Sequence, residues 1–157
     1  MKRPNSTLAT WQWLSRKPAG KWAFTQLVCW KAPYFGSIRP KFTDLRPGFC
    51  EIHMKKRRRV LNHIGTVHAI AICNMAELAG GTMTEVTVPS NYRWIPKGMK
   101  VEYLAKAETD LKAVAKIDPI PAFAASTELP VTVTVTDAAS KPVFRAVITM
   151  WVSPRNS

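Results

Sequence analysis

Four residues that could take part in chemistry lie close together in the run NHIGTVHAIAICNMAELAGG, residues 62–81: Asn62, Gly65, His68 and Glu77. From 66 to 78 the chain is otherwise largely apolar on every face of a 3.6-residue period, which predicts a helix buried on all sides. A carboxylate on such a helix must be paired, neutralised or used in acid–base or nucleophilic chemistry. Glu77 is therefore the first candidate for a catalytic residue.

The segment before this helix is predicted to be helical first and extended afterwards. Residues 7–31 have a helical pattern in two pieces, with Ser6 or Thr7 as the cap and a break at 17–20. The second piece brings Trp22, Gln26, Cys29 and Trp30 near one another on the helix surface, and we expect it to pack on a sheet. Prolines 40 and 47 mark a loop, and an extended segment follows from 49 to about 59.

The segment after the helix is predicted to be all strand. Gly80-Gly81 predicts the end of the helix, because glycine readily takes a left-handed conformation there. Strands are expected at 83–88, 99–107, 111–117, 129–136 and 143–152, and the short gap at 108–110 has the spacing of a hairpin. Residues 154–157 are expected to fray. This order predicts an α+β fold in which a strongly curved antiparallel sheet wraps around a central helix.

The length and composition favour one domain. A chain of 157 residues can bury a core of ordinary size, and no apolar run approaches the roughly 18 residues of a membrane span. The basic start leads into Trp11, Gln12 and Trp13, so we expect no signal peptide, a cytoplasmic location and no membrane partner. The three cysteines, Cys29, Cys50 and Cys73, match neither a disulfide framework nor a zinc pattern, and no metal site is expected.

Positive charge is concentrated in the first part of the chain. The net charge is +13, and residues 1–60 carry 14 Lys/Arg against only Asp44 and Glu51. The densest run is KKRRR at 55–59. Such a run suits nucleic acid, an anionic membrane face or a phosphorylated small molecule, and it is equally compatible with a solvated strand end.

With these elements in place, the residues resemble the hotdog-fold acyl-CoA thioesterases of the phenylacetate-degradation type, called PaaI-like. The motif of that family resembles an Asn, a Gly three residues later, a His six residues after the Asn, and an acid nine residues beyond the His; Asn62, Gly65, His68 and Glu77 occupy these positions. The runs 84–88 and 99–107 look like the third and fourth strands of the family. The resemblance implies a single hotdog domain, with a helical extension at 1–32, the hotdog core at 33–152 and a tail at 153–157.

Two positions depart from the family pattern. Ala69 and Ile70 stand where the family has two glycines after its His, and the acid is Glu rather than Asp. A backbone N–H donor survives the change from Gly to Ala if the dihedral angles stay helical. The motif RWIPKGM at 93–99 has no assigned counterpart, which indicates an uncharacterised subgroup.

The resemblance implies hydrolysis of an acyl-CoA thioester to free acid and CoA. Negative charge would develop on the thioester carbonyl oxygen, and the backbone N–H of Ala69, at the helix start, would stabilise it. Glu77 would act as general base for a water or as nucleophile, and the sequence leaves both routes open. Asn62 would orient the water or the acyl carbonyl from a neighbouring subunit, while His68 is expected to position or cap.

The resemblance further implies how substrate and partners would be held. Coenzyme A enters as part of the substrate, and no separate cofactor is expected. Its phosphates suit Arg57, Arg58, Arg59, Lys97 and Lys106, and Asn74 could bond Glu77 or fix the substrate. We expect a homo-oligomer, a dimer or a dimer of dimers, and regard a nucleic-acid partner as unlikely. Two alternatives stay open: a hotdog protein that binds acyl-CoA or an acyl carrier protein without turnover, and a basic nucleic-acid-binding module.

Overall fold

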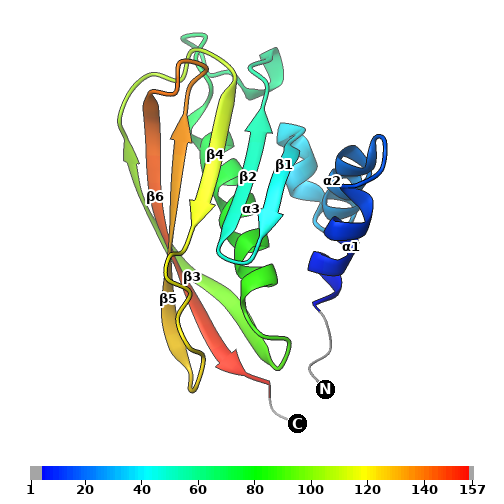
Figure 1. Cartoon of the computed structure of the whole chain (residues 1–157). Coiled ribbons are helices and arrows are strands. Elements are labelled where there is room, and N and C mark those ends of the chain that lie inside the picture. The colour runs from blue at the N-terminus through cyan, green and yellow to red at the C-terminus, as the bar shows by residue number, and fades with distance from the viewer. Residues whose placement is uncertain (1–4, 156–157) are drawn as a thin grey trace.

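Figure 1 shows a computed structural model of the chain, which describes residues 5–155. The elements in chain order are α1 (Ser6–Leu14), α2 (Gly20–Lys31), the 3-10 helix η1 (Pro33–Ile38), β1 (Lys41–Arg46), β2 (Phe49–Met54), the 3-10 helix η2 (Arg58–Val60), α3 (Ala69–Thr87), β3 (Tyr92–Tyr103), β4 (Leu111–Lys116), β5 (Thr127–Thr136) and β6 (Pro142–Pro154).

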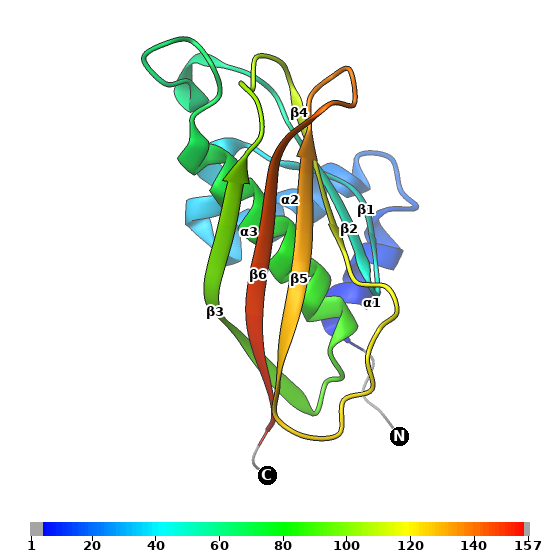
Figure 2. The same ribbon diagram turned by 90° about the vertical axis from the view of Figure 1, so that its left-hand side faces the viewer.

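The strands form one antiparallel sheet that curves around α3. Their order is β1-β2-β4-β5-β6-β3, so β1 and β3 are the two edges. Helix α3 contacts all six strands and runs obliquely across one face of the sheet (Figure 2). The predicted fold class, a curved antiparallel sheet on a central helix with helices at the N-terminus, is confirmed.

The core lies between the sheet and α3, and strand alternation supplies it. On β5, Val131, Val133 and Val135 are fully buried, while the threonines between them are at least partly exposed, as the alternating sequence predicts. On β6, Ile148 and Met150 face the same core. This apolar layer packs α3 against the sheet and so fixes the position of the helix.

The predicted end of the central helix at Gly80-Gly81 is wrong. Helix α3 continues to Thr87, so the expected strand at 83–88, and its likeness to a family strand, are also wrong. The two glycines instead allow close packing. A Cβ on Gly80 would lie 2.8 Å from Ile148 Cδ1, and one on Gly81 would lie 3.2 Å from the Trp94 ring. Tertiary contact therefore overrides the local stop signal.

The predicted hairpin between 99–107 and 111–117 is also wrong. Strand β3 begins earlier, at Tyr92, and pairs with β6, whereas β4 pairs with β2 and β5. The two strands lie on different sides of β5 and β6 in the sheet. A three-residue gap fits a hairpin, but the sequence cannot show which strand each segment will meet.

The N-terminal helices pack beside β1 and against the end of α3. Asn5, rather than Ser6 or Thr7, caps α1; its side chain accepts from Leu8 N (3.1 Å) and donates to the Glu85 carbonyl oxygen near the end of α3. Helix α2 packs on the sheet edge as expected, but the packing residues are Phe24 and Thr25. Thr25 accepts from Phe42 N of β1 (3.3 Å).

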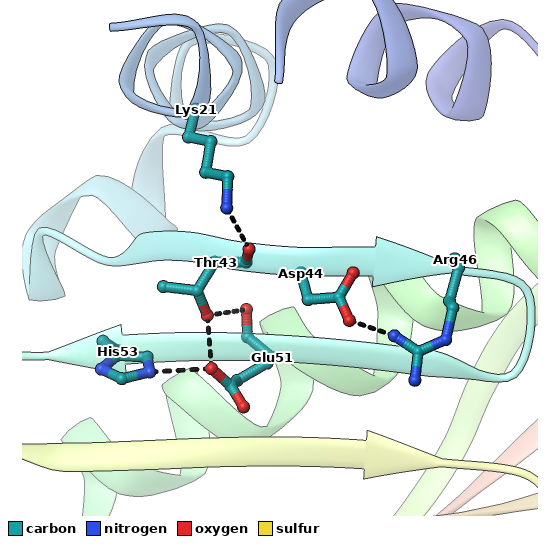
Figure 3. Close-up of polar contacts among 6 residues, drawn as sticks. All are labelled: Lys21, Thr43, Asp44, Arg46, Glu51 and His53. Carbon is teal, nitrogen blue, oxygen red and sulfur yellow. Dashed lines mark hydrogen bonds and ion pairs between the residues drawn. The ribbon is translucent and has the colours of Figure 1, made fainter. Parts of the chain in front are cut away.

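A chain of polar contacts links α2 to the first two strands (Figure 3). Lys21 donates to the Thr43 carbonyl oxygen (2.7 Å), and the Thr43 hydroxyl donates to Glu51 Oε1 (2.8 Å), which also contacts His53 Nε2 (3.0 Å). Burial alone would raise the pKa of Glu51, but the hydrogen bonds to His53 and Thr43 and the nearby positive charges outweigh it, so this pKa is lowered. These contacts fix the helical extension to the sheet edge.

The end of the chain is more anchored than predicted. Strand β6 continues to Pro154, and Arg155 N donates to the Asn91 carbonyl oxygen (2.8 Å). Arg155 Nε also donates to the Tyr92 carbonyl oxygen (2.9 Å). The rest of the expected frayed tail, residues 156–157, lies outside the described residues. Within residues 5–155, no helix combines the length and the hydropathy needed to cross a membrane.

The close approach at Gly80 leads to a stability prediction. Gly80→Val places methyl groups where Ile148 already sits, and we expect it to lower the free energy of unfolding by about 1–3 kcal/mol. Gly98→Val is the matched control, because a Cβ at Gly98 has no neighbour within 4 Å. Urea unfolding followed by circular dichroism measures both. Equal stability of the two variants would contradict the packing role of Gly80.

Candidate functional site

The loop before α3 is closed by the side chain of Asn62. Its Oδ1 accepts from Ile64 N and Thr66 N (both 3.1 Å), and its Nδ2 donates to the Thr66 hydroxyl (2.8 Å). Gly65 takes a left-handed conformation with φ +79°, which glycine adopts without strain. In this structure the Asn62 carboxamide therefore stabilises its own loop through hydrogen bonds to the following residues, as in an Asx-type turn.

The start of α3 is held from three sides. His68 is the N-cap, and its Nδ1 accepts from Ile70 N (3.1 Å), which leaves the proton of the neutral ring on Nε2. His68 N donates to the Val60 carbonyl oxygen (2.7 Å), and Val67 N donates to that of Ala107 (2.8 Å). Within residues 5–155 the Ala69 N–H has no hydrogen-bond acceptor. This free amide lies at the positive end of a 19-residue helix.

The prediction that the central helix is buried on all sides is wrong. Ile70 and Glu77 are exposed, and Cys73 between them is partly exposed. The sheet curves around α3 but leaves this one stripe uncovered, at the spacing of neighbours on a helix face. Glu77 is thus not enclosed by its own chain, and only a second molecule could bury it.

Glu77 lines a groove of about 450 Å³, here called the Glu77 groove. Its walls come from α1, α2, η1, α3, β3 and β6, and most of the side chains are apolar: they include Val28, Phe35, Leu78, Trp94 and Met150. The charged residues that line it are Lys31, Glu77 and Glu85. An apolar channel with a carboxylate at its wall suits an apolar substrate with one reactive polar group.

Trp94 is fixed within this groove by two contacts. Its Nε1 donates to Glu85 Oε2 (2.7 Å), so one of the two acids of the groove is engaged in holding an indole ring. Gly81 leaves room for the far edge of that ring. Glu77 has no hydrogen bond or ion pair to the described residues, which distinguishes it from Glu85 as the free carboxylate.

A second, smaller hollow of about 200 Å³ lies at the start of the same helix, here called the Asn74 hollow. Its lining residues include Tyr34, Ser37, Arg59, His68, Ile70 and Asn74. Asn74 is only 7% exposed, and its Nδ2 donates to the Ser37 hydroxyl (3.2 Å) rather than to Glu77. Its Oδ1 is buried and has no partner among the described residues. Such an acceptor favours a ligand that brings an N–H or O–H group.

The free helix-start amide and the carboxylate are far apart in one chain. Ala69 and Glu77 are eight residues apart on α3, which corresponds to about 12 Å along the helix axis. A thioester carbonyl and the water that attacks it lie within about 3–3.5 Å of each other. These two groups of the same chain therefore cannot act on one thioester.

Cys73 is the other nucleophile on the exposed stripe. Burial raises the pKa of its thiol above the ordinary value, and a hydrogen bond with Tyr103 offsets this only in part. The thiol therefore stays protonated at neutral pH, which is unsuited to a nucleophile. No cluster of three or more His, Cys, Asp or Glu side chains suited to a metal occurs in residues 5–155.

The predicted CoA-binding cations do not gather at one place in the chain. Arg59 lines the Asn74 hollow, and Arg57 donates to the Ser37 carbonyl oxygen (2.8 Å), while burial and the charges of Arg39 and Arg59 lower its pKa. Arg58 and Lys106 are exposed near the start of α3. Lys97 instead pairs with Glu128 (2.6 Å) over the Trp151 ring, on the sheet face away from α3.

A larger hollow of about 620 Å³ lies away from α3, against the loop that follows β4. Its carboxylates are already paired: Asp118 lies 3.2 Å from Lys116, and Glu128 pairs with Lys97. It contains no histidine or cysteine. Size alone therefore does not make it the better candidate.

The sequence of residues 20–152 matches a family model described as a domain of unknown function, DUF4442. The chain belongs to the DUF4442 family. A crystal structure from a genomics programme, for which no activity is stated, is 50% identical to it; the match covers 95% of this chain and 98% of that one, with a TM-score of 0.84. The search of curated proteins gave no match.

Less similar structures resemble this DUF4442 protein in fold. A Pseudomonas aeruginosa protein described as a probable thioesterase is 21% identical, with a TM-score of 0.76 over 83% of this chain and 93% of its own. A thioesterase family protein from Silicibacter pomeroyi is 16% identical, with a TM-score of 0.71 over 83% and 96%. The fold of the DUF4442 protein is therefore the hotdog fold. These comparisons do not distinguish a PaaI-like subgroup.

Several groove residues were not predicted as site residues from the sequence, although Trp94 belongs to the motif noted at 93–99. Lys31, Phe35, Glu85 and Trp94 come from separate elements, and only folding brings them together. One signal was available: Glu77, Gly81 and Glu85 are four residues apart, so they share a helix face. This shared face was missed because the sequence predicted that the helix ends at Gly80-Gly81, before Glu85.

The contacts of Asn62 lead to a prediction that separates a loop role from a catalytic one. Asn62→Ala removes three hydrogen bonds and should lower the free energy of unfolding by about 1–2 kcal/mol. Asn62→Asp keeps an acceptor for both amides and should stay close to wild type. Thermal melts measure both, with the exposed His63→Ala as control. Wild-type stability of Asn62→Ala would exclude the loop role.

Proposed function

We propose that this DUF4442 protein hydrolyses an acyl-CoA thioester in a homodimer. The observation that carries the proposal is the uncovered stripe of α3, where the free carboxylate of Glu77 lines an apolar groove. The Asn74 hollow, with its unpartnered acceptor, lies one turn away on the same helix. Structural neighbours described as thioesterases suggest the reaction class to test.

The two catalytic groups would come from different chains. If two copies of α3 lie antiparallel with their uncovered stripes together, Glu77 of one chain approaches the free Ala69 amide of the partner subunit. That arrangement supplies the short separation that one chain cannot provide. It also removes water from Glu77, which strengthens its interaction with the developing charge.

The reaction then follows from these groups. Acting as base, Glu77 takes a proton from a water whose oxygen attacks the thioester carbon, and the carbonyl electrons move to the oxygen that the Ala69 amide stabilises. Collapse of this intermediate breaks the carbon–sulfur bond, and the thiolate of CoA takes up the proton. Acting as nucleophile, the carboxylate would attack directly, and water would then cleave the resulting anhydride.

The substrate would be oriented by the two hollows. The apolar walls of the Glu77 groove suit an apolar acyl chain, with Trp94 and Met150 in its lining. The Asn74 carboxamide oxygen suits an amide N–H of the pantetheine arm. Arg58, Arg59 and Lys106, near the helix start, would face the phosphates of CoA.

The edge strand β3 offers the means to bring two chains together. It is 12 residues long and pairs with β6 on one side only, and such an edge is a template for pairing with another strand. Tyr103, at its end, is exposed, and the centre of its ring lies 5.9 Å from that of Phe144. Its phenol is close enough to Cys73 of the uncovered stripe to affect the pKa of that thiol. Strand β3 and the stripe therefore form one continuous surface.

The role of Glu77 is tested by release of free thiol from a panel of short, long and aromatic acyl-CoAs. Glu77→Gln should lose at least about 100-fold in turnover while it keeps its fold, because the amide can neither accept the proton nor attack. Glu85→Gln is the informative comparison within the groove, and Glu108→Gln in an exposed loop is the neutral control.

Three results would overturn this assignment. No thiol release by wild type across the panel would remove the reaction. Tight binding of an intact thioester would favour the alternative of a non-catalytic acyl-CoA-binding protein. If Glu85→Gln lost turnover while Glu77→Gln kept it, the role of general base would be assigned to Glu85 instead.

The dimer is tested by light scattering after gel filtration. Wild type should have the mass of two chains or a multiple, and Tyr103→Glu should shift the mass toward the monomer, because it places a charge on the proposed contact surface. Ile120→Glu, at an exposed apolar side chain of the loop after β4, is the matched control and should leave the mass unchanged. A monomeric wild type would contradict the shared site.

A further inference from the structure

The outer side of α1, α2 and η1 carries four strongly exposed aromatic side chains. Trp13, Trp22, Trp30 and Tyr34 are 61%, 63%, 78% and 70% exposed. Other aromatic residues of the same helices, Trp11 and Phe24, are almost fully buried against β1. The exposed rings contribute little to the core of the chain, so their apolar area is available to a partner.

The exposed rings of α2 lie on one face of the helix. Trp22, Gln26 and Trp30 follow each other at intervals of four residues, and Leu27 beside them is also exposed. Phe24 and Val28, on the other side of the helix, pack toward the core. Helix α2 thus has two apolar faces, one turned inward and one turned to solvent.

The surroundings of these rings are uniformly basic. From residue 5 to residue 43 the chain contains no Asp or Glu, and it contains Arg16, Lys17, Lys21, Lys31, Arg39 and Lys41, all of them exposed. Lys17 Nζ lies 3.3 Å from the centre of the Trp13 ring. Lys21 Nζ donates to the Thr43 carbonyl oxygen. Tyr34 lines the Asn74 hollow, and Lys31 lines the Glu77 groove. We call the three tryptophan rings with the remaining five cations, Arg16, Lys17, Lys21, Arg39 and Lys41, the aromatic–basic face.

We propose that the aromatic–basic face docks on the surface of an anionic lipid bilayer. Tryptophan and tyrosine concentrate at the level of the lipid headgroups, where the ring is buried and its polar edge stays hydrated. A helix with tryptophan and leucine on one face and flanking lysine or arginine lies in that interface. Each cation near an anionic leaflet adds about 1 kcal/mol of attraction.

The charge of the face argues for lipid over a second copy of this chain. Two such faces brought together would oppose cation to cation, with no carboxylate in either to neutralise them. Nucleic acid could stack its bases on the aromatic rings and contact the cations, but it would gain little from the exposed aliphatic side chain of Leu27, which lipid would bury. The sequence alone led us to expect no membrane partner, and the exposure of the rings is what changes that expectation.

The position of the face links it to the Glu77 groove. Val28 and Lys31 of α2 line that groove from the side of the helix opposite Trp22 and Trp30. A helix with its side chains is about 10–12 Å across, so a bilayer on one side lies that close to the groove on the other. Helix α2 packs on β1, the edge opposite β3, and the face stays free in a dimer formed through β3 (Figure 1).

Binding to lipid vesicles tests the proposal independently of any thioesterase activity. The wild-type protein should co-sediment with vesicles rich in phosphatidylglycerol, more weakly with vesicles of phosphatidylcholine alone, and less at high salt. Trp22→Ser with Trp30→Ser should weaken binding at least about tenfold, because two large apolar side chains are lost from the interface. Arg16→Gln with Lys17→Gln should weaken binding only to the anionic vesicles.

The controls lie on the opposite side of the molecule. Trp151→Ser removes an exposed tryptophan of β6, and Lys141→Gln with Arg145→Gln removes two exposed cations of the β5–β6 region; all three changes should leave vesicle binding unchanged. Circular dichroism checks the fold of each variant. Thiol release from a water-soluble acyl-CoA should be the same for wild type and the Trp22/Trp30 variant.

Four outcomes would overturn the proposal. They are equal binding to neutral and anionic vesicles, no binding to either, a change of oligomeric mass in the Trp22/Trp30 variant, and salt-dependent binding to an oligonucleotide without binding to vesicles. The third would assign the face to a second copy of the chain, and the fourth would assign it to nucleic acid. Absence of thiol release in the wild type and in every variant alike would contradict the Glu77 assignment alone, because vesicle binding is measured without it.

Discussion

The structure depends on how completely one sheet can cover one helix. Six strands contact α3, and the close approach of Ile148 to Gly80 and of Trp94 to Gly81 draws the last strands tightly against it. The sheet nevertheless ends at β3, and a stripe of α3 through Ile70, Cys73 and Glu77 stays uncovered. The fold thus produces a stable core and an incomplete surface at once.

The incomplete surface gives the candidate site its character. Burial of the carboxylate and its pairing with a helix-start amide both require a second molecule, because the geometry of one helix keeps those groups about 12 Å apart. A homodimer would meet both requirements with the same contact. The proposed activity and the proposed dimer would then depend on the same contact, in which a second chain covers the part of α3 that its own sheet leaves exposed.

The helical extension has a different relation to the core. Its inner side is fixed by aromatic packing around Phe24 and by the contacts of Lys21 and Thr25 with β1. Figure 3 shows the contact of Lys21. Its outer side presents rings and cations that the fold does not use. Because the same helix lines the Glu77 groove, what binds outside could influence which substrates arrive inside.

The sequence by itself determined the fold class, the central helix and the spacing of Asn62, Gly65, His68 and Glu77, because these follow from short-range periodicity and motif spacing. It could not determine where α3 ends, since Gly80-Gly81 is read differently once Ile148 and Trp94 pack on it. Nor could it determine the neighbour of β3, the free side of α3 or the outward direction of Trp22 and Trp30. Only the tertiary structure decided these, because each depends on contacts between segments far apart in the chain. A local sequence pattern does not specify which distant segment a helix face or strand edge will contact.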